Sequence, residues 1–228
     1  MQSLGPFLDC MGLTGPRFVV RDFFGLRKVP PGETVSVRGH MSRVARPHIL
    51  HLNIIHCGFH LLDAVESESA DRELDFAVHR TRQIYDQIGL GIARVQHFAI
   101  GGQHGTAVAN IDNDGEASEL CGAFSVDNNG ADCFMVLTYA GNRVGSSRVS
   151  GCDKDGKDSG VVVEITQGNN SLTAKALAHE LAHFLGVEDH SDDENNLLSR
   201  SPDGVELTGS QGGKILSHCF VTECPDLP

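Results

Sequence analysis

HELAHFLGVEDH, residues 179–190, is the stretch on which the interpretation of the whole chain depends. In a helix, His179 and His183 lie one turn apart on the same face, so their imidazoles can bind one Zn²⁺. Glu180 beside them can take up a proton from a water at that ion. Gly186 allows the helix to end abruptly, and three residues further on Asp189 becomes a candidate third ligand. Three protein ligands would leave the fourth position open, as a catalytic zinc site requires.

The competing interpretation of this stretch is an amphipathic core helix with two incidental surface histidines. H-E-x-x-H alone is a modest signal in a chain that contains 12 histidines. The motif is followed at the expected positions by a glycine, Gly186, and by a residue that can bind a metal, Asp189. These two matches make a chance occurrence much rarer. We therefore predict a metal site here.

The segment resembles the signature of the metzincin metallopeptidases, H-E-x-x-H-x-x-G-x-x-H followed by a turn that contains methionine. Asp189 stands in the third-ligand position, as in the snapalysin-like members of that clan. Residues 196–199, with the sequence NLLS, resemble the methionine turn, and Leu198 stands where methionine is expected. The resemblance is sharp over residues 179–199 and diffuse over residues 48–220.

This resemblance implies a zinc-dependent endopeptidase that acts on a protein or peptide substrate, with Glu180 as the general base. The extended segment 142–151 would pair with the substrate. A secreted or extracellular location is favoured by the resemblance, although the first residues show no signal peptide. The pocket for the substrate side chain beyond the scissile bond would be lined by Ser199, Arg200, Ser201 and Pro202.

The periodicity of the apolar residues by itself indicates an α+β domain. The metzincin resemblance, with a matrixin- or archaemetzincin-like order, adds a twisted mixed sheet with two long helices as an upper subdomain, residues 47–186. A small, mostly irregular lower subdomain with a final helix would follow over residues 187–228. Strands are predicted at 49–59, 92–100, 133–139 and 161–166, and helices at 71–88, 172–185 and 209–220.

Residues 1–46 form a separate N-terminal segment, predicted either as a hairpin at the domain edge or as a regulatory strip. They contain seven Lys/Arg and three acids, whereas the whole chain has a formal net charge of −12. A basic strip could lie across an acidic cleft, with Cys10 or Asp9 reaching the zinc. The acidic remainder argues against a nucleic-acid partner, because binding phosphate requires the opposite charge.

Two features of the middle of the chain leave alternatives open. Residues 101–131 are predicted to be a solvated loop, although 110–115 partly resemble a calcium-binding loop, so a structural Ca²⁺ is the minority interpretation. Among the seven cysteines, Cys57 and Cys133 lie in apolar runs and are predicted to be buried thiols. Disulfides in a secreted protein could join Cys219 to Cys224, or Cys121 to Cys152. No apolar run is long enough to span a membrane.

Three other functions compete with a general metzincin-like peptidase. In zinc peptidases of another class a distant Glu is the third ligand, but loop-bound Glu206 is a poor candidate. The chain could also be a non-catalytic, metal-stabilised binding module, against which the presence of Glu180 argues. A narrow-specificity processing protease or toxin would cleave one protein and fail on generic substrates.

Overall fold

The computed structural model describes most of the chain beyond the N-terminal segment. The predicted hairpin or regulatory strip, with Asp9 and Cys10, lies outside the described residues, as does much of the predicted substrate-pairing segment 142–151. The described residues are 46–126, 129–141, 143–147, 151–152, 154, 159–166 and 168–224.

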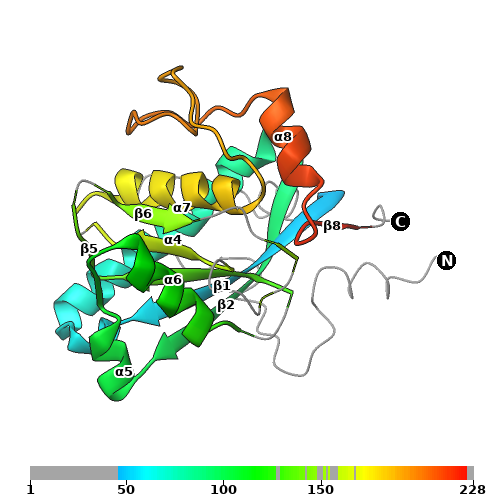
Figure 1. Ribbon diagram of the computed structural model, residues 1–228. Helices are drawn as coiled ribbons and strands as arrows, with labels where there is room; N and C mark the ends of the chain where they lie inside the picture. The colour runs from blue at the N-terminus through cyan, green and yellow to red at the C-terminus, as the bar shows by residue number, and fades with distance from the viewer. Residues whose placement is uncertain are drawn as a thin grey trace.

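A twisted mixed sheet forms the centre of the fold, with the strand order β2-β1-β4-β7-β6 (Figure 1). The first four of these strands run parallel, and β6 pairs with β7 in the antiparallel direction. β8 adds an antiparallel pairing at the start of β1. The parallel strands are mostly buried, as expected for strands covered on both faces. Their bounds are β1 His48–Cys57, β2 Leu90–Ile100, β4 Ala131–Val136, β6 Gly145–Ser147, β7 Val161–Glu164 and β8 Thr222–Glu223.

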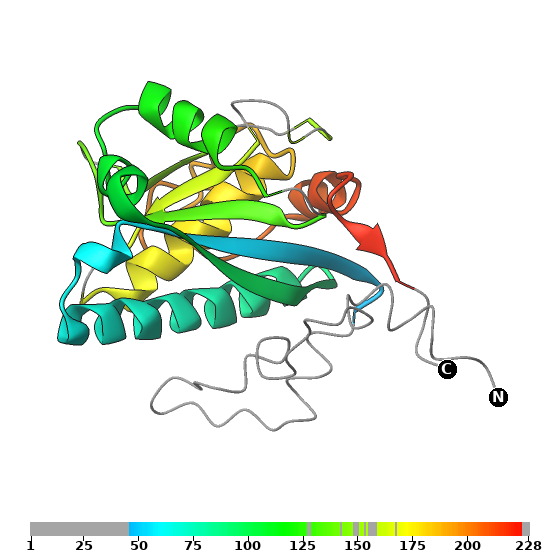
Figure 2. The ribbon, with the colours of Figure 1, turned by 90° about the horizontal axis from the view of Figure 1, so that it is seen from below.

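Helices cover both faces of the sheet (Figure 2). The two long helices, α4 (Ala64–Asp86) and α7 (Asn170–Phe184), pack against each other on one face, and α6 (Asp114–Ala123) covers the other. The hydroxyl of Tyr85 on α4 donates to the carbonyl of Ala178 on α7 at 2.9 Å, so the two long helices are also tied by a buried hydrogen bond. The smaller elements are η1 Phe59–Leu61, α5 Gly102–Ala107, β3 Asn110–Ile111, β5 Thr138–Tyr139 and α8 Gly209–Leu216.

The predicted strands and helices are present, with one large shift at the start of α4. The apolar period predicts a start at residue 71, but the helix begins at Ala64. Asp63 accepts hydrogen bonds from the backbone N–H groups of Val65 and Glu66, and Glu66 accepts one from Asp63 in return. This capping box starts the helix in a polar stretch, where no regular spacing of apolar residues marks a helix.

The prediction that residues 101–131 form a solvated loop is wrong. The region contains α5, β3 and α6, and Asn113 caps α6 by accepting from the N–H of Glu116. The carboxylate of Asp114 accepts from the hydroxyl of Tyr139 and from Arg143. In the part of the chain that the structure describes, no group of three or more metal-competent side chains lies here, so structural calcium remains a prediction without geometric support.

The cysteines pair differently from both proposed disulfides. The observed disulfide joins Cys152 to Cys219, and Cys224 is also disulfide-bonded. Cys121 is buried in the core cluster between α6 and the sheet and is not part of a disulfide. The predicted buried thiols Cys57 and Cys133 are confirmed.

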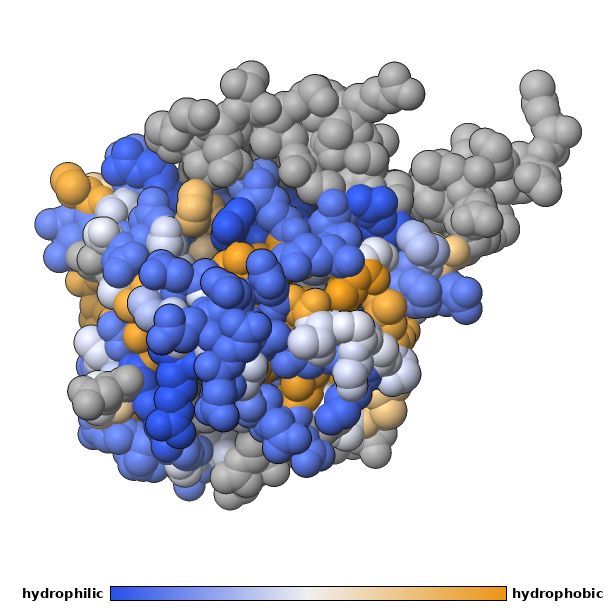
Figure 3. Space-filling model, turned by 90° about the horizontal axis from the view of Figure 1, so that it is seen from above, coloured by the Kyte–Doolittle hydropathy of each residue, from blue (hydrophilic) through white to orange (hydrophobic). Residues whose placement is uncertain are grey.

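Between the end of α7 and the start of α8 the chain has no regular helix or strand. Two isolated bridges hold this region together, from Ser191 to Ser199 and from Asn196 to Glu206. The face seen in Figure 3 is mainly hydrophilic, with apolar side chains confined to small areas. None of the helices in the described ranges combines the length and hydropathy that crossing a bilayer requires. The predicted subdomain boundary at residue 186 stays a prediction.

Candidate metal centre

Helix α7 carries the motif and presents it to a cleft. The helix is anchored at its start by Asn169, whose side chain accepts from the N–H of Leu172. One side of the helix is buried against the sheet and α4. The chain leaves the helix through Gly186, whose φ of 102° is a backbone conformation that favours glycine. This turn brings the following residues back beneath the histidines.

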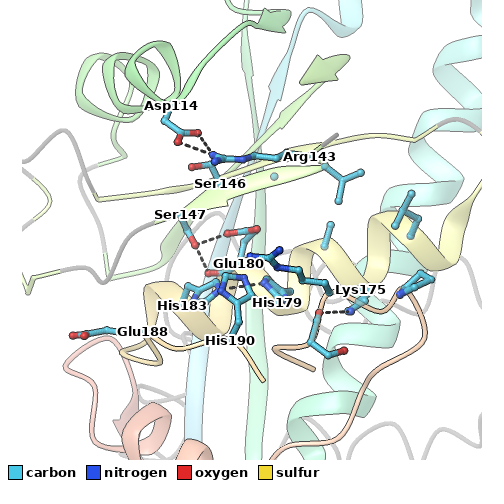
Figure 4. Close-up of a pocket in the computed structure, with 17 residues that line it drawn as sticks. Asp114, Arg143, Ser146, Ser147, Lys175, His179, Glu180, His183, Glu188 and His190 are labelled. Carbon is cyan, nitrogen blue, oxygen red and sulfur yellow. Dashed lines mark hydrogen bonds and ion pairs between the residues drawn. The ribbon is translucent and has the colours of Figure 1, made fainter. Parts of the chain in front are cut away.

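Three imidazoles converge at the end of this helix (Figure 4). One ligand atom from each of His179, His183 and His190 lies within 4.8 Å of the others. The ring of His190 is centred 5.2 Å from that of His179 and 4.8 Å from that of His183. Two of the rings thus come from one turn of helix and the third from the return loop.

The backbone fixes which nitrogen of each helical histidine faces inward. Nδ1 of His179 lies 2.7 Å from the carbonyl oxygen of Leu197, and Nδ1 of His183 lies 2.6 Å from that of Val187. A carbonyl only accepts, so both Nδ1 atoms must carry the proton and donate it. In neutral rings this leaves both Nε2 atoms with a free lone pair.

The neutral form of both rings is favoured by their surroundings. Burial lowers the pKa of His179 to about 4, and the neighbouring rings of His183 and His190 contribute to this decrease. The hydrogen bond to the carbonyl of Leu197 opposes it. Burial also lowers the pKa of His183. At neutral pH both imidazoles are therefore in the state that binds a metal.

The donor set fits a tetrahedral metal ion. Nε2 of His179 and Nε2 of His183 lie 3.1 Å apart, although in the neutral tautomers neither has a proton to offer the other. Two nitrogens that each bind Zn²⁺ at about 2.1 Å lie about 3.4 Å from one another in a tetrahedral site. A cation between these lone pairs would resolve their repulsion, and imidazole nitrogen is a preferred zinc ligand.

The geometry favours His190 over the predicted Asp189 as the third member of the group. From Val187 to His190 the chain has neither helix nor turn, and a ring nitrogen of His190 lies within 4.8 Å of those of His179 and His183. Glu188, Asp189 and His190 are all exposed, and of the three only Glu188 and His190 line the cleft. His190 follows the third-ligand position of the metzincin-like spacing by one residue, and Asp189 as a ligand stays a prediction.

Glu180 lies beside the triad, between α7 and the edge strand β6. Its Oε2 is 2.7 Å from Oγ of Ser147, and the same hydroxyl lies 2.8 Å from the Glu180 carbonyl oxygen. Burial raises the pKa of Glu180 to about 7, and the hydrogen bond from Ser147 and the charge of Arg143 oppose the rise. A carboxyl group with such a pKa can accept and release a proton near neutrality.

Close approach of β6 to the helix keeps Glu180 in this position. A Cβ built on Gly145 would lie 2.9 Å from Cγ of Glu180 and 2.9 Å from the carbonyl oxygen of Val162. Both distances are shorter than real side chains tolerate. Only glycine therefore allows the strand to pack directly over the carboxylate.

The predicted counterpart of the methionine turn lies behind the histidines. Leu198 is fully buried, and the carbonyl of Leu197 before it accepts from His179. Asn196 and Gln211 exchange two side-chain hydrogen bonds of 2.9 and 3.1 Å, which attach the turn to α8. The role of Gln211 was not predicted, because its partner is 15 positions away in the sequence.

The triad and Glu180 lie in a cleft of about 970 Å³. Of the residues predicted to line a substrate pocket, Ser199, Arg200 and Pro202 line it, whereas Ser201 contributes a carbonyl that accepts from Lys175. Other polar residues also line this cleft, of which Arg143, Ser146 and Ser147 belong to the predicted substrate-pairing segment, whereas sequence reasoning did not place Asp114, Lys175, Glu188 or His190 there. The residues not placed there come from distant elements or lie beside the motif, and no local pattern assigned them to the cleft.

No protein-family model matches the sequence, and no curated protein matches it. Among solved structures, the fold is similar to metalloproteinase-II from Bacteroides fragilis, with 14% identity and a TM-score of 0.50 over 92% of this chain and 60% of that one. It is also similar to a chain in a structure of a chaperone–substrate complex, with 11% identity and a TM-score of 0.51 over 75% and 33% of the two chains. Archaemetzincin from Methanopyrus kandleri gives 11% identity and a TM-score of 0.46 over 73% and 93%.

The chain thus spans less than two thirds of the length of the Bacteroides protein. At these identities the similarity concerns the fold alone. It confirms the predicted α+β class, with a mixed sheet and several helices arranged as in a metalloproteinase.

Proposed function

We propose that this chain is a zinc-dependent endopeptidase. The observation that carries the proposal is the convergence of His179, His183 and His190 beside Glu180 in an open cleft. A purely structural zinc site is closed by four protein ligands and needs no carboxylate with a raised pKa beside it. The fold similarity to a metalloproteinase is consistent with this function.

In this proposal the residues divide into ligands and a proton carrier. His179, His183 and His190 would hold the zinc, in place of the set with Asp189. The bound ion supplies Lewis-acid chemistry, lowering the pKa of a water and polarising the peptide carbonyl. Glu180 accepts the proton of the attacking water and delivers it to the leaving amine, while Ser147 keeps the carboxylate oriented.

The edge strand β6 offers the proposed place for an extended peptide. Among the described residues β6 pairs only with β7, so its other side can pair with a substrate backbone. It passes directly over Glu180, which would align the scissile bond with the triad. This supports the predicted role of the described part of segment 142–151.

Gly145→Ala is expected to lower turnover by about 10- to 100-fold, because displacing Glu180 by a fraction of an ångström misaligns proton transfer. Zinc content should remain unchanged, since no ligand is touched. Gly213→Ala on α8, where a Cβ meets nothing within 4 Å, is the matched control. Wild-type turnover in a folded Gly145→Ala protein would contradict the proposed contact.

The proposed function is tested by metal analysis together with cleavage of casein and of a peptide library. We expect about one zinc per chain, cleavage that stops after treatment with a chelator, and recovery when zinc is restored. A chain that binds zinc but cleaves nothing would instead be the binding module or the narrow-specificity protease. A chain that binds no metal would overturn the proposal.

A further inference from the structure

A buried ammonium group lies in the cleft on one side of the metal centre. Lys175 precedes His179 by one helical turn, so both side chains lie on the cleft face of α7. Lys175 is only 7% exposed. Figure 4 shows Lys175 and Glu188 at opposite ends of the site, with the triad between them.

Lys175 forms no salt bridge among the described residues, although the negative charge of Asp203 acts on it. Its Nζ donates to the carbonyl oxygen of Ser199 at 2.9 Å and to that of Ser201. An ammonium has three donors, so one N–H remains for another acceptor. Burial lowers the pKa of Lys175 and the charge of Asp203 opposes this, so a second carboxylate beside the ammonium would stabilise its charged form further.

The same side of the cleft carries a second cation. Arg200 follows Ser199, lines the cleft and is exposed, and among the described residues it forms no ion pair. Arg143 differs, because it is bound to Asp114 at 2.6 and 2.7 Å. Lys175 and Arg200 thus place two cationic groups on this side of the cleft in a chain with a net charge of −12, and they favour an anionic group there.

The direction of β6 indicates which substrate side chain meets this pocket. Figure 4 shows the chain running from Arg143, on the side of Lys175, through Ser146 to Ser147, toward the side of Glu188. A peptide pairing antiparallel to β6, the commoner and stronger arrangement, runs the opposite way. Its residues after the scissile bond then lie toward Lys175.

We propose that the enzyme prefers an acidic side chain, Asp or Glu, on the residue immediately after the scissile bond, with Lys175 and Arg200 as the specificity-determining groups. This inference rests on the proposed peptidase function. The remaining N–H of Lys175 donates to the substrate carboxylate within the pocket, and Arg200 pairs with it at the mouth. Charge-assisted hydrogen bonds of this kind discriminate strongly against an uncharged analogue.

Matched peptides that differ only by Glu or Gln at this position test the inference, because the two side chains have the same shape. For the zinc-loaded wild-type chain we expect kcat/KM for the Glu peptide to exceed that for the Gln peptide by about tenfold or more. Lys175→Met should bring the ratio close to one, and Arg200→Gln should lower it several-fold. Lys214→Met, an exposed lysine on α8 outside the cleft, should leave it unchanged.

The outcomes separate this inference from the proposed function. Failure to cleave any library peptide would refute the peptidase itself. Cleavage with equal rates for Glu and Gln, or a preference for acid before the scissile bond, would overturn only the specificity. If Lys175 serves only to hold the 199–201 segment, its variant slows both peptides equally and the ratio persists, which also overturns it. Should Lys175→Met fail to fold, the wild-type ratio and Arg200→Gln still decide.

Discussion

Glu180→Gln is expected to lower peptide hydrolysis by about 10²- to 10⁴-fold, the usual contribution of a positioned general base. The amide keeps the shape of the carboxylate and can still accept the hydrogen bond from Ser147, which lies 2.7 Å from Oε2. It cannot take up a proton at neutral pH. The loss therefore reports the chemistry of the group and not its packing.

Zinc binding should survive in the same variant, at about one ion per chain, because Glu180 is assigned to the water and not to the metal. Glu206→Gln is the matched control. Glu206 is the exposed acid that would be the third ligand in the competing class of zinc peptidase, so the substitution removes that candidate. The hydrogen bonds of Glu206 to Leu197 and Asn195 use only backbone atoms and are therefore kept. Full activity in Glu180→Gln, or loss of zinc together with activity, would refute the assigned role.

Local sequence patterns were sufficient for the scaffold of the site. The spacing of His179 and His183 predicts that both imidazoles lie on one helical face, and the structure has this arrangement. Gly186 was predicted to end the helix, and it adopts a positive φ just after Phe184. These features depend on a few consecutive residues and on helical geometry, so one sequence is enough to predict them.

Contacts between distant segments could not be predicted in this way. Ser147 reaches Glu180 across 33 positions, and Lys175 binds a carbonyl 24 positions away. The disulfide joins cysteines 67 positions apart. Nothing in the composition around these residues indicates their partners, because the contacts are created by the order of strands in the sheet and by the path of the loops.

Residues 101–131 illustrate a different cause of error. Their many Gly, Asp and Asn residues are typical of loops, and they led to the prediction of a solvated segment. In the structure the same residue types act as helix caps, as Asn113 does for α6. Composition therefore identified the turn-forming residues but did not distinguish a loop from the start of a helix.

His190→Ala is expected to weaken zinc binding by about a hundredfold or more, whereas Asp189→Ala should leave it almost unchanged. Loss of a group that only orients a ligand already costs about 10- to 100-fold in metal affinity, so loss of a ligand should cost at least as much. His190 places its ring 4.8 Å from that of His183. Asp189 is exposed and is not among the residues that line the cleft.

Zinc per chain after dialysis against a competing chelator distinguishes the two variants, and circular dichroism verifies that both are folded. Asp189→Ala is a matched control because it truncates the adjacent side chain in the same loop. The metzincin-like spacing predicts the reverse result, since it places the third ligand at Asp189. An Asp189→Ala protein without zinc beside a fully loaded His190→Ala protein would therefore restore the original prediction. The expected result would establish that the third ligand lies one residue later in this loop than the metzincin-like spacing predicts.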